Sequence, residues 1–235
     1  MIFQEDKAAT GTAASRKNRY IMEENVMGNR AIIQPINSTM GVYLHWNGGL
    51  DSVTAFLKYC EMKGYRPFGG KYSDGYGIAR FCQVVGNYFG GNSSIGLVNN
   101  VTRDDAEGLD NGIYIIDGWK IVKRIGRETP SEGYNITEML CDIDDAQPEA
   151  ERLTKGYITA EEVSPDELKI GDKVYYADYN GKISLHTVIG FGACGKRCNG
   201  TDVTDMPYID KYGNNEPENN INNYIRENVR ICKEE

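Results

Sequence analysis

Residues 41–64 read GVYLHWNGGLDSVTAFLKYCEMKG, and they decide the fold class because a strand pattern gives way to a helix pattern across one short loop. Residues 41–46 have the composition of a short strand. Beyond the loop, apolar side chains recur at the i, i+3, i+4 and i+7 positions of a helix, namely Val53, Phe56, Leu57 and Cys60. We expect Asp51 or Ser52 to cap this helix and Gly64 to end it.

Elements of the same two kinds flank this stretch. Residues 31–36 form another strand-type run, which predicts a hairpin or a paired edge with the strand above. A second helix is predicted over 76–89, with Asp74 as its cap and Gly90-Gly91 at its end. Its apolar stripe predicts that it packs against the first helix.

The next strands form a hairpin. Residues 113–116 and 119–122 are rich in β-forming side chains, and Asp117-Gly118 between them is a strong turn signal, since both residues tolerate positive φ. Residues 94–98 predict a strand before this hairpin. A third helix is indicated by Ile136, Met139, Leu140 and Ile143, with Pro148 closing it.

The predicted fold class is α+β, with four segments along the chain. They are a flexible tail over 1–28, a small mixed α/β domain of two to three helices and β-hairpins over 29–147, an acidic linker over 148–167, and a β-rich domain over 168–235. In the last segment, strands are expected over 168–176 and 183–191, joined by Asn180-Gly181, with further short strands at 201–203 and 228–232. This pattern resembles an SH3-like β-barrel, a fold that assigns no activity by itself.

Composition limits the classes of function. No apolar run approaches the roughly 18 residues of a membrane span, and the first residues lack the core of a signal peptide, so we expect a cytoplasmic protein with no membrane partner. Six cysteines without an export signal are expected to be reduced thiols. The spacing of Cys194 and Cys198 is loose for a zinc site and no second CxxC pair exists, so free thiols are the favoured interpretation, with a zinc site or a reactive thiol as the alternatives. Two histidines provide few candidates for histidine-based catalysis. We therefore predict no catalytic residues, no metal and no cofactor.

Negative charge is concentrated in one stretch. Residues 128–168 hold 12 acids and 2 bases, a charge of −10, so the rest of a chain of net charge −8 carries about +2. One interpretation is a solvated helix face with a linker, and the other is a surface for a basic partner. Affinity for nucleic acid through a basic field is disfavoured, and no direct sequence-specific binding of it is expected.

The candidate partner-binding residues are acids of this stretch and tyrosines of the last segment. They are Glu138, Asp142, Asp144, Asp145, Glu149, Glu151, Tyr175, Tyr176 and Tyr179. Tyrosine is an adaptable contact residue at recognition surfaces, although β-propensity and half-buried faces explain the same residues.

The loop Asn47-Gly48-Gly49-Leu50-Asp51-Ser52 resembles the Ser-Gly-Gly-x-Asp-Ser loop of the N-type ATP pyrophosphatases. The resemblance implies that Gly48, Gly49, Asp51 and Ser52 hold pyrophosphate in front of a helix N-terminus. However, Asn47 replaces the leading serine, no buried parallel strand follows the first helix, and the domain is short for a doubly wound sheet. The favoured interpretation is a strand-to-helix turn, and nucleotide binding is the alternative.

The segment 41–122 also resembles proteins encoded on phages and conjugative elements of Gram-positive bacteria, through HWNGG-DS-AFLKYC, ARFCQVVGNYFGG and NGIYIIDGWKIV. Accessory proteins of such elements often inhibit host defences such as CRISPR effectors, and many of these inhibitors are small, acidic and non-enzymatic. The missing catalytic residues and the concentrated acids predict a non-catalytic binding protein, and the resemblance is consistent with this prediction. The expected partner is a basic host protein, with a nucleic-acid-guided nuclease as the favoured class.

Overall fold

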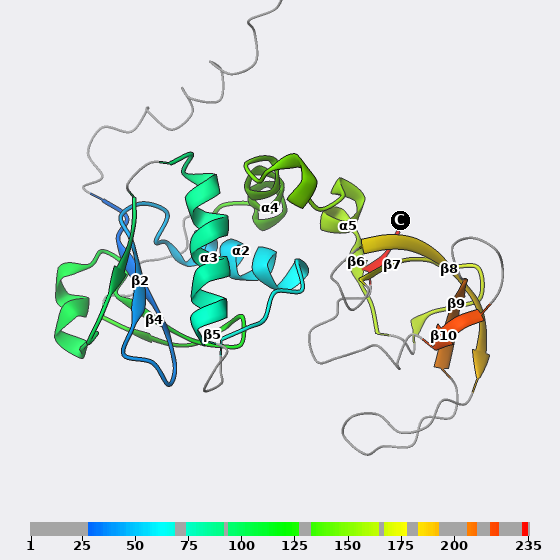
Figure 1. Ribbon diagram of the computed structural model, residues 1–235, viewed down its shortest axis with the longest axis horizontal. Coiled ribbons are helices and arrows are strands. Elements are labelled where there is room, and N and C mark those ends of the chain that lie inside the picture. Colours follow the sequence, from blue (N-terminus) through cyan, green and yellow to red (C-terminus); the bar gives the residue numbers. More distant parts are fainter. Residues whose placement is uncertain are drawn as a thin grey trace, which may run out of the picture.

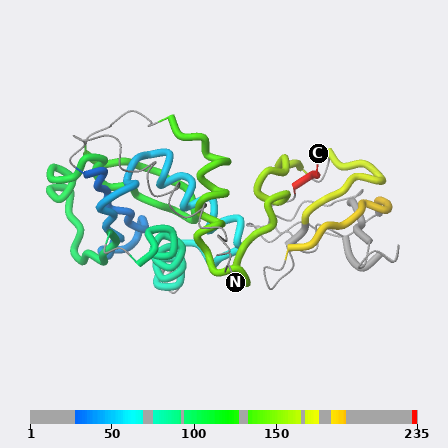
Figure 2. Tube along the Cα trace, turned by 90° about the horizontal axis from the view of Figure 1, so that it is seen from above, coloured from blue at the N-terminus to red at the C-terminus, as the bar shows by residue number. Residues whose placement is uncertain are grey.

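The computed structural model describes residues 28–68, 74–91, 94–126, 133–164, 167–177, 183–192, 206–210, 217–220 and 232–234. Two sheets and several helices make up this part of the chain, which confirms the α+β class. One sheet with its helices forms one lobe and the second sheet forms another, as Figure 1 and the view from above in Figure 2 show. Among these residues, no helix has both the length and the apolar composition needed to cross a membrane.

The first sheet has five strands in the order β3-β2-β1-β4-β5. Their bounds are Ala31–Pro35 for β1, Gly41–Leu44 for β2, Ile95–Val98 for β3, Ile113–Asp117 for β4 and Lys120–Ile125 for β5. The β1–β2 pair confirms the predicted pairing of the first two strands. Strands β1 and β4 run parallel, whereas all other neighbours are antiparallel, so the sheet is mixed rather than doubly wound.

Helices α2 (Leu50–Met62), α3 (Asp74–Tyr88) and α4 (Ile136–Asp145) pack together over one face of this sheet. The predicted contact between the first two helices is confirmed, because Phe56 of α2 meets Phe81 of α3 edge-on with ring centroids 6.3 Å apart. Gly64 follows α2 with a φ of 64°, as the predicted stop requires. The predicted cap is wrong, since Gly49 is the N-cap and no side chain caps the helix.

The predicted hairpin is confirmed, but its turn lies one residue later than expected. Asp117 pairs with Lys120, so Gly118 and Trp119 form the turn, and Gly118 supplies the positive φ. The shift has a tertiary cause. The Gly118 amide donates to the Phe68 carbonyl, and the buried Trp119 ring packs on Phe68 with centroids 4.8 Å apart.

The other face of the first sheet is covered by a short 3₁₀ helix, η1 (Arg103–Gly108). Ala106 of η1 packs on Ile32 of β1 and Ile113 of β4, which forms a second, smaller apolar cluster. A capping box between Thr102 and Asp105 begins this helix. The sheet is therefore buried on both faces near β1 and β4.

The segment predicted as an acidic linker contains regular structure. It includes η2 (Glu149–Glu151), α5 (Lys155–Thr159) and β6 (Glu161–Glu162). Its apolar residues are buried in the core that the first sheet and its helices share, namely Leu153, Tyr157, Ile158 and Ala160. Acidic residues thus form the outer surface of a packed segment.

The second sheet has the order β10-β9-β8-β7-β11-β6, and its neighbours are antiparallel. Its remaining strands are β7 (Lys173–Ala177), β8 (Ile183–Gly192), β9 (Met206–Asp210), β10 (Pro217–Asn220) and β11 (Cys232–Lys233). Strands β7 and β8 confirm the two predicted strands, although β7 begins only at Lys173. The described strands do not close, since β10 and β6 are the two ends of the order, so an SH3-like barrel is not shown.

Several predictions from the sequence fall outside the described residues. They concern the tail up to residue 27, the turn at 180–181 and the strand at 201–203. The boundaries of the domains and the linker stay predictions.

One buried carboxylate ties these parts together. Asp144 of α4 is only 6 % exposed, and its Oδ1 accepts hydrogen bonds from the Tyr59 hydroxyl of α2 at 2.6 Å and from the Leu153 amide at 2.7 Å. Burial, followed by this hydrogen bond, raises the pKa of Tyr59 above its usual range. These buried hydrogen bonds connect α4 to α2 and to the segment after η2.

We predict that Asp144→Ala lowers the free energy of unfolding by about 3 kcal/mol, because two buried donors lose their acceptor.

Tyr59→Phe will change how the free energy of unfolding depends on pH. An unfolded tyrosine ionises near pH 10, so the raised pKa of Tyr59 stabilises the fold below about pH 10 and this contribution is lost as the pH rises further. Above about pH 10, the free energy of unfolding of Tyr59→Phe will therefore fall less steeply than that of the unsubstituted protein.

Urea unfolding followed by circular dichroism between pH 7 and pH 11 measures both effects. Tyr76→Phe is the control, since Tyr76 is 60 % exposed. An equal pH slope in Tyr59→Phe and the unsubstituted protein would contradict the role given to Tyr59.

Candidate functional site

The outer face of α4 carries a row of carboxylates. Glu138, Asp142 and Asp145 lie at i, i+4 and i+7 and are exposed, and exposed Glu149 follows at the start of η2. We call these four residues the acidic stripe. The opposite face of α4 buries Met139, Leu140 and Ile143, so packing of the apolar face determines which way the acids point.

Two contacts fix the start and the end of α4. At its start, the Asn135 side chain accepts hydrogen bonds from the amides of Thr137 and Glu138. Beyond its end, the buried Gln147 side-chain nitrogen donates to the carbonyls of Val84 and Ile143. The acidic stripe therefore lies on a rigid support.

Three of the four charges of the stripe, those of Glu138, Asp142 and Glu149, are weakly compensated. Among the described residues, no lysine or arginine lies within ion-pair distance of Glu138, Asp142 or Glu149. Arg152 is close, but its guanidinium donates to the backbone carbonyls of Asp145 and Gln147 rather than to a carboxylate. The stripe thus presents a local negative field to solvent.

Two of the predicted acids lie elsewhere. Asp144 is buried and bonded to Tyr59 and Leu153, so it is a structural residue and cannot contact a partner. Glu151 is exposed, but Lys63 Nζ lies 3.7 Å from its Oε2 and also donates to its backbone carbonyl. Glu151 therefore marks the border of the stripe.

The predicted tyrosine surface is corrected in part. Tyr175 is only 9 % exposed and packs edge-on against Tyr157, with ring centroids 5.9 Å apart. The Tyr175 hydroxyl lies close to Gly156, since a Cβ at Gly156 would overlap it. For Tyr176 the structure describes the backbone in β7 only, and Tyr179 lies outside the described residues.

The Asn-Gly-Gly loop before α2 has the geometry of a strand-to-helix turn. Asn47 has a φ of 54°, and the Gly48 amide donates to the Asn29 carbonyl at 2.7 Å. A Cβ at Gly48 would lie 2.5 Å from the Asn29 oxygen and 2.8 Å from the Ala31 nitrogen, so close backbone approach requires this glycine.

The acid of this loop is also engaged inside the protein. Asp51 Oδ2 accepts hydrogen bonds from the amides of Gly133 at 2.8 Å and Tyr134 at 3.1 Å, and Asp51 is 9 % exposed. Ser52 is fully buried, and its hydroxyl accepts a bond from the Asn47 side chain at 3.4 Å. The Asp51 carboxylate is thus bonded to backbone amides of the segment before α4. These contacts favour the turn interpretation.

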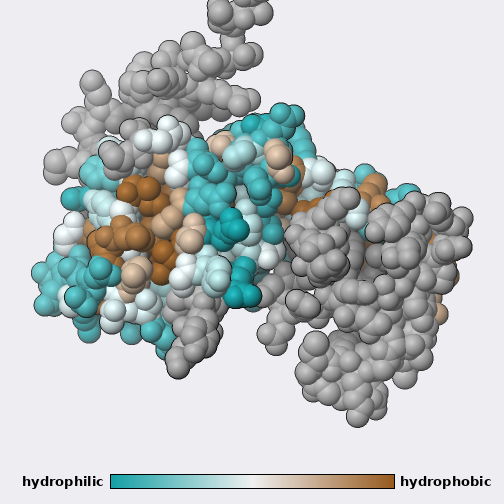
Figure 3. Space-filling view, in the orientation of Figure 1, coloured by the Kyte–Doolittle hydropathy of each residue, from teal (hydrophilic) through white to brown (hydrophobic). Residues whose placement is uncertain are grey.

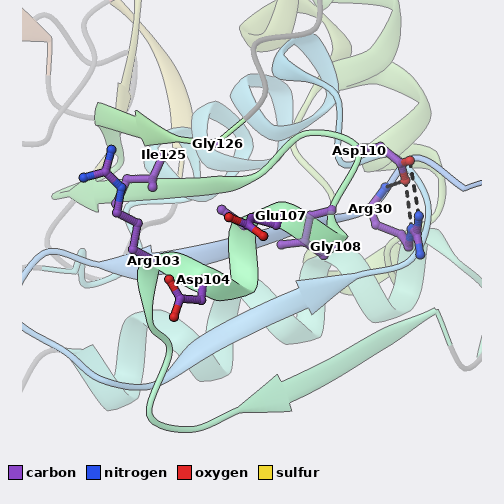
Figure 4. A pocket seen from close by; sticks show the side chains of 10 residues that line it. Arg30, Arg103, Asp104, Glu107, Gly108, Asp110, Ile125 and Gly126 are labelled. Atoms are coloured by element: carbon purple, nitrogen blue, oxygen red, sulfur yellow. Dashed lines mark hydrogen bonds and ion pairs between the residues drawn. The ribbon is translucent and has the colours of Figure 1, made fainter.

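A cavity of about 450 Å³ lies between η1 and the end of β5 (Figure 4). Arg103 lies at one end, and Arg30 and Asp110 lie paired at the other, with Arg30 Nε 2.9 Å from Asp110 Oδ2. The hydrogen bond from Arg30 holds the pKa of the Asp110 carboxyl below its usual range. Since Asp104 and Glu107 also line the cavity, both signs of charge are present and no field of a single sign results.

One close polar pair in the second sheet is not among the predicted site residues. Ser184 Oγ lies 2.7 Å from His186 Nε2 on β8, and both residues are half-buried. The sequence feature that indicates this pair is a serine and a histidine two residues apart in a predicted strand, because such residues lie on the same face of the sheet. The hydrogen bond holds the His186 ring against its own strand.

Comparison of the chain with the models of protein families, with curated proteins and with solved structures finds no match. Within the described part of the chain, no group of three or more His, Cys, Asp or Glu side chains is arranged to hold a metal ion.

We predict that Gly48→Ala destabilises the protein by about 1–3 kcal/mol, because the added methyl group overlaps the backbone of β1. The loss will be equal with and without millimolar MgATP, since a turn residue does not depend on a ligand. Thermal unfolding in both buffers measures it. A rise in the melting temperature of the unsubstituted protein on adding MgATP would instead support the nucleotide-binding alternative.

Proposed function

We propose that this chain is a non-catalytic protein-binding module whose acidic stripe binds a basic surface of a host protein. Following the resemblance to proteins of mobile elements, the favoured partner class is a nucleic-acid-guided defence nuclease, which the module would inhibit by occupying a basic nucleic-acid channel. The observation that carries the proposal is the exposed row of Glu138, Asp142 and Asp145 on a helix whose other face is anchored in the core.

Physical chemistry supports a binding role for such a row. Carboxylates spaced three or four residues apart on a helix repel one another, which costs a few tenths of a kcal/mol per pair. A basic partner relieves this repulsion. Because the helix is rigid, binding a partner costs little conformational entropy for the backbone that carries these charges. The field of the charges steers association over about 8 Å at physiological ionic strength.

We predict that the triple variant Glu138→Gln, Asp142→Asn, Glu149→Gln associates with its partner about tenfold more slowly at low salt. Its dependence on salt will flatten, because steering by opposite charges acts chiefly on the on-rate. Stability will change little, since relief of repulsion offsets the loss of an acid in the first turn of α4. Interferometry against purified, guide-loaded nucleases at 50 mM and 500 mM salt measures the rates.

The matched control is Asp104→Asn, Glu107→Gln, Asp117→Asn, which also removes three exposed acids but from η1 and the end of β4. It should keep the on-rate of the unsubstituted protein. Equal on-rates for the stripe variant and the unsubstituted protein would eliminate the charged-surface mechanism. A complete lack of association and of cleavage inhibition with such nucleases would eliminate the partner class.

A further inference from the structure

Cationic and tyrosine side chains alternate around the end of α2 and the first turns of α3. Lys63 Nζ lies 5.8 Å and Arg80 Cζ 5.2 Å from the centroid of the Tyr65 ring, and Arg66 Cζ lies 4.9 Å from the centroid of the Tyr76 ring. We call these five residues the cation–tyrosine cluster. All three contacts fall within the roughly 6 Å range of cation–π interactions.

The fold holds this cluster in place. The Tyr65 amide donates to the Cys60 carbonyl at the end of α2, and the Trp119 indole nitrogen donates to the Tyr65 carbonyl at 3.0 Å. Tyr76 and Arg80 lie four residues apart on α3 and so share one face of that helix. The backbone that carries the cluster is therefore tied to both the helix layer and the β4–β5 turn.

The charge of the cluster differs from that of the whole chain. Among the described residues, no carboxylate lies within ion-pair distance of Arg66 or Arg80, and both are exposed. Arg80 donates to the Gln83 side chain, a neutral acceptor. Lys63 alone of the three cations meets an acid, Glu151. A cationic surface thus lies beside the acidic stripe, in a chain of net charge −8.

The surface of the cluster combines flat aromatic faces with guanidinium groups. Tyr76 is 60 % exposed although a guanidinium lies over its ring. Tyr65 is half-buried, and burial together with nearby Glu151 raises its pKa to about 12, so it stays neutral at physiological pH. In Figure 3, hydrophilic surface lies over α2 and α3, beside a hydrophobic patch on the side of the first sheet.

We propose that the cation–tyrosine cluster binds single-stranded nucleic acid without sequence preference. Arg66 and Arg80 would bind phosphates, and a base would stack on Tyr76, the combination that single-strand binding surfaces use. An acidic peptide could pair with the arginines, but its carboxylates offer no aromatic face to stack on the exposed ring. This inference goes beyond the proposed function and does not depend on it, since it concerns other residues and another ligand.

The test is fluorescence anisotropy of a labelled oligothymidylate and of an RNA of equal length, with the full chain and no other protein. Binding should be weak. The logarithm of the association constant should fall with the logarithm of salt concentration with a slope of about −1.4, since single strands lose about 0.7 per neutralised phosphate and the two arginines neutralise one each. Arg66→Gln with Arg80→Gln should weaken binding about tenfold or more. Tyr76→Ala should weaken it roughly fivefold or more, since it removes the stacking surface.

Two further variants make the outcomes decisive. Lys120→Gln with Lys123→Gln removes two exposed cations of β5 and should change binding less than about twofold. Arg66→Lys with Arg80→Lys should keep the salt slope but weaken binding, since lysine stacks poorly. Circular dichroism checks that each variant is folded.

Three results would overturn the proposal. They are no binding of either oligonucleotide at 50 mM salt, equal loss in the β5 control and the arginine variant, and stronger competition by polyglutamate than by unlabelled oligonucleotide. The last result would assign the cluster to an acidic protein instead. None of these outcomes bears on the acidic stripe, whose test uses a protein partner.

Discussion

The buried carboxylate of Asp144 joins α4 to α2, which lies 85 residues earlier in the chain, and to the segment that follows η2. Its Oδ1 accepts hydrogen bonds from the hydroxyl of Tyr59 in the last turn of α2 and from the amide of Leu153 beyond η2. The carboxylate therefore fixes the rotation of α4, and with it the direction in which the acidic stripe faces. It also anchors the chain at the point where it leaves α4 for α5 and the second sheet. Because buried polar groups are costly to leave without partners, separating these elements is unfavourable.

That arrangement brings two surfaces of opposite charge next to each other. Lys63 at the end of α2 contacts Glu151 in η2, so the cation–tyrosine cluster begins where the acidic stripe ends. The contact itself is exposed on the Glu151 side and stabilises the fold little. The contact matters because it places the two surfaces side by side. A partner that presents a basic protein surface next to nucleic acid would contact both of them.

The loop before α2 illustrates how a ligand-binding motif and a structural turn can share a sequence. Both need glycines for close backbone approach and an acid or hydroxyl at a helix start. In this protein the close approach is to β1, and the carboxylate of Asp51 receives the amides of Gly133 and Tyr134. The motif alone cannot separate the two uses, because the groups that decide the matter lie about 80 residues away in the chain.

Local patterns in the sequence determined much of the fold. Helical spacing predicted α2, α3 and α4, and turn and strand composition predicted the pairing of β1 with β2 and of β4 with β5, because these features depend on residues close together in the chain. Local charge likewise predicted an acidic surface over α4 and η2. The spacing of α4 even contained a signal for Asp144, which lies four residues after Leu140 on the apolar face and so differs from Asp142 and Asp145.

Tertiary structure alone decided the rest. It paired β1 with β4 in parallel, moved the hairpin turn to Gly118 and Trp119, and gave the supposed linker a buried apolar side. It also buried Tyr175 against Tyr157 and brought Tyr65 within reach of Arg80. The physical reason is common to all of these. Contacts between elements that are distant in sequence determine whether a side chain is buried or exposed. They also determine whether a cation lies next to an aromatic ring or a carboxylate. Local periodicity does not specify which elements contact one another.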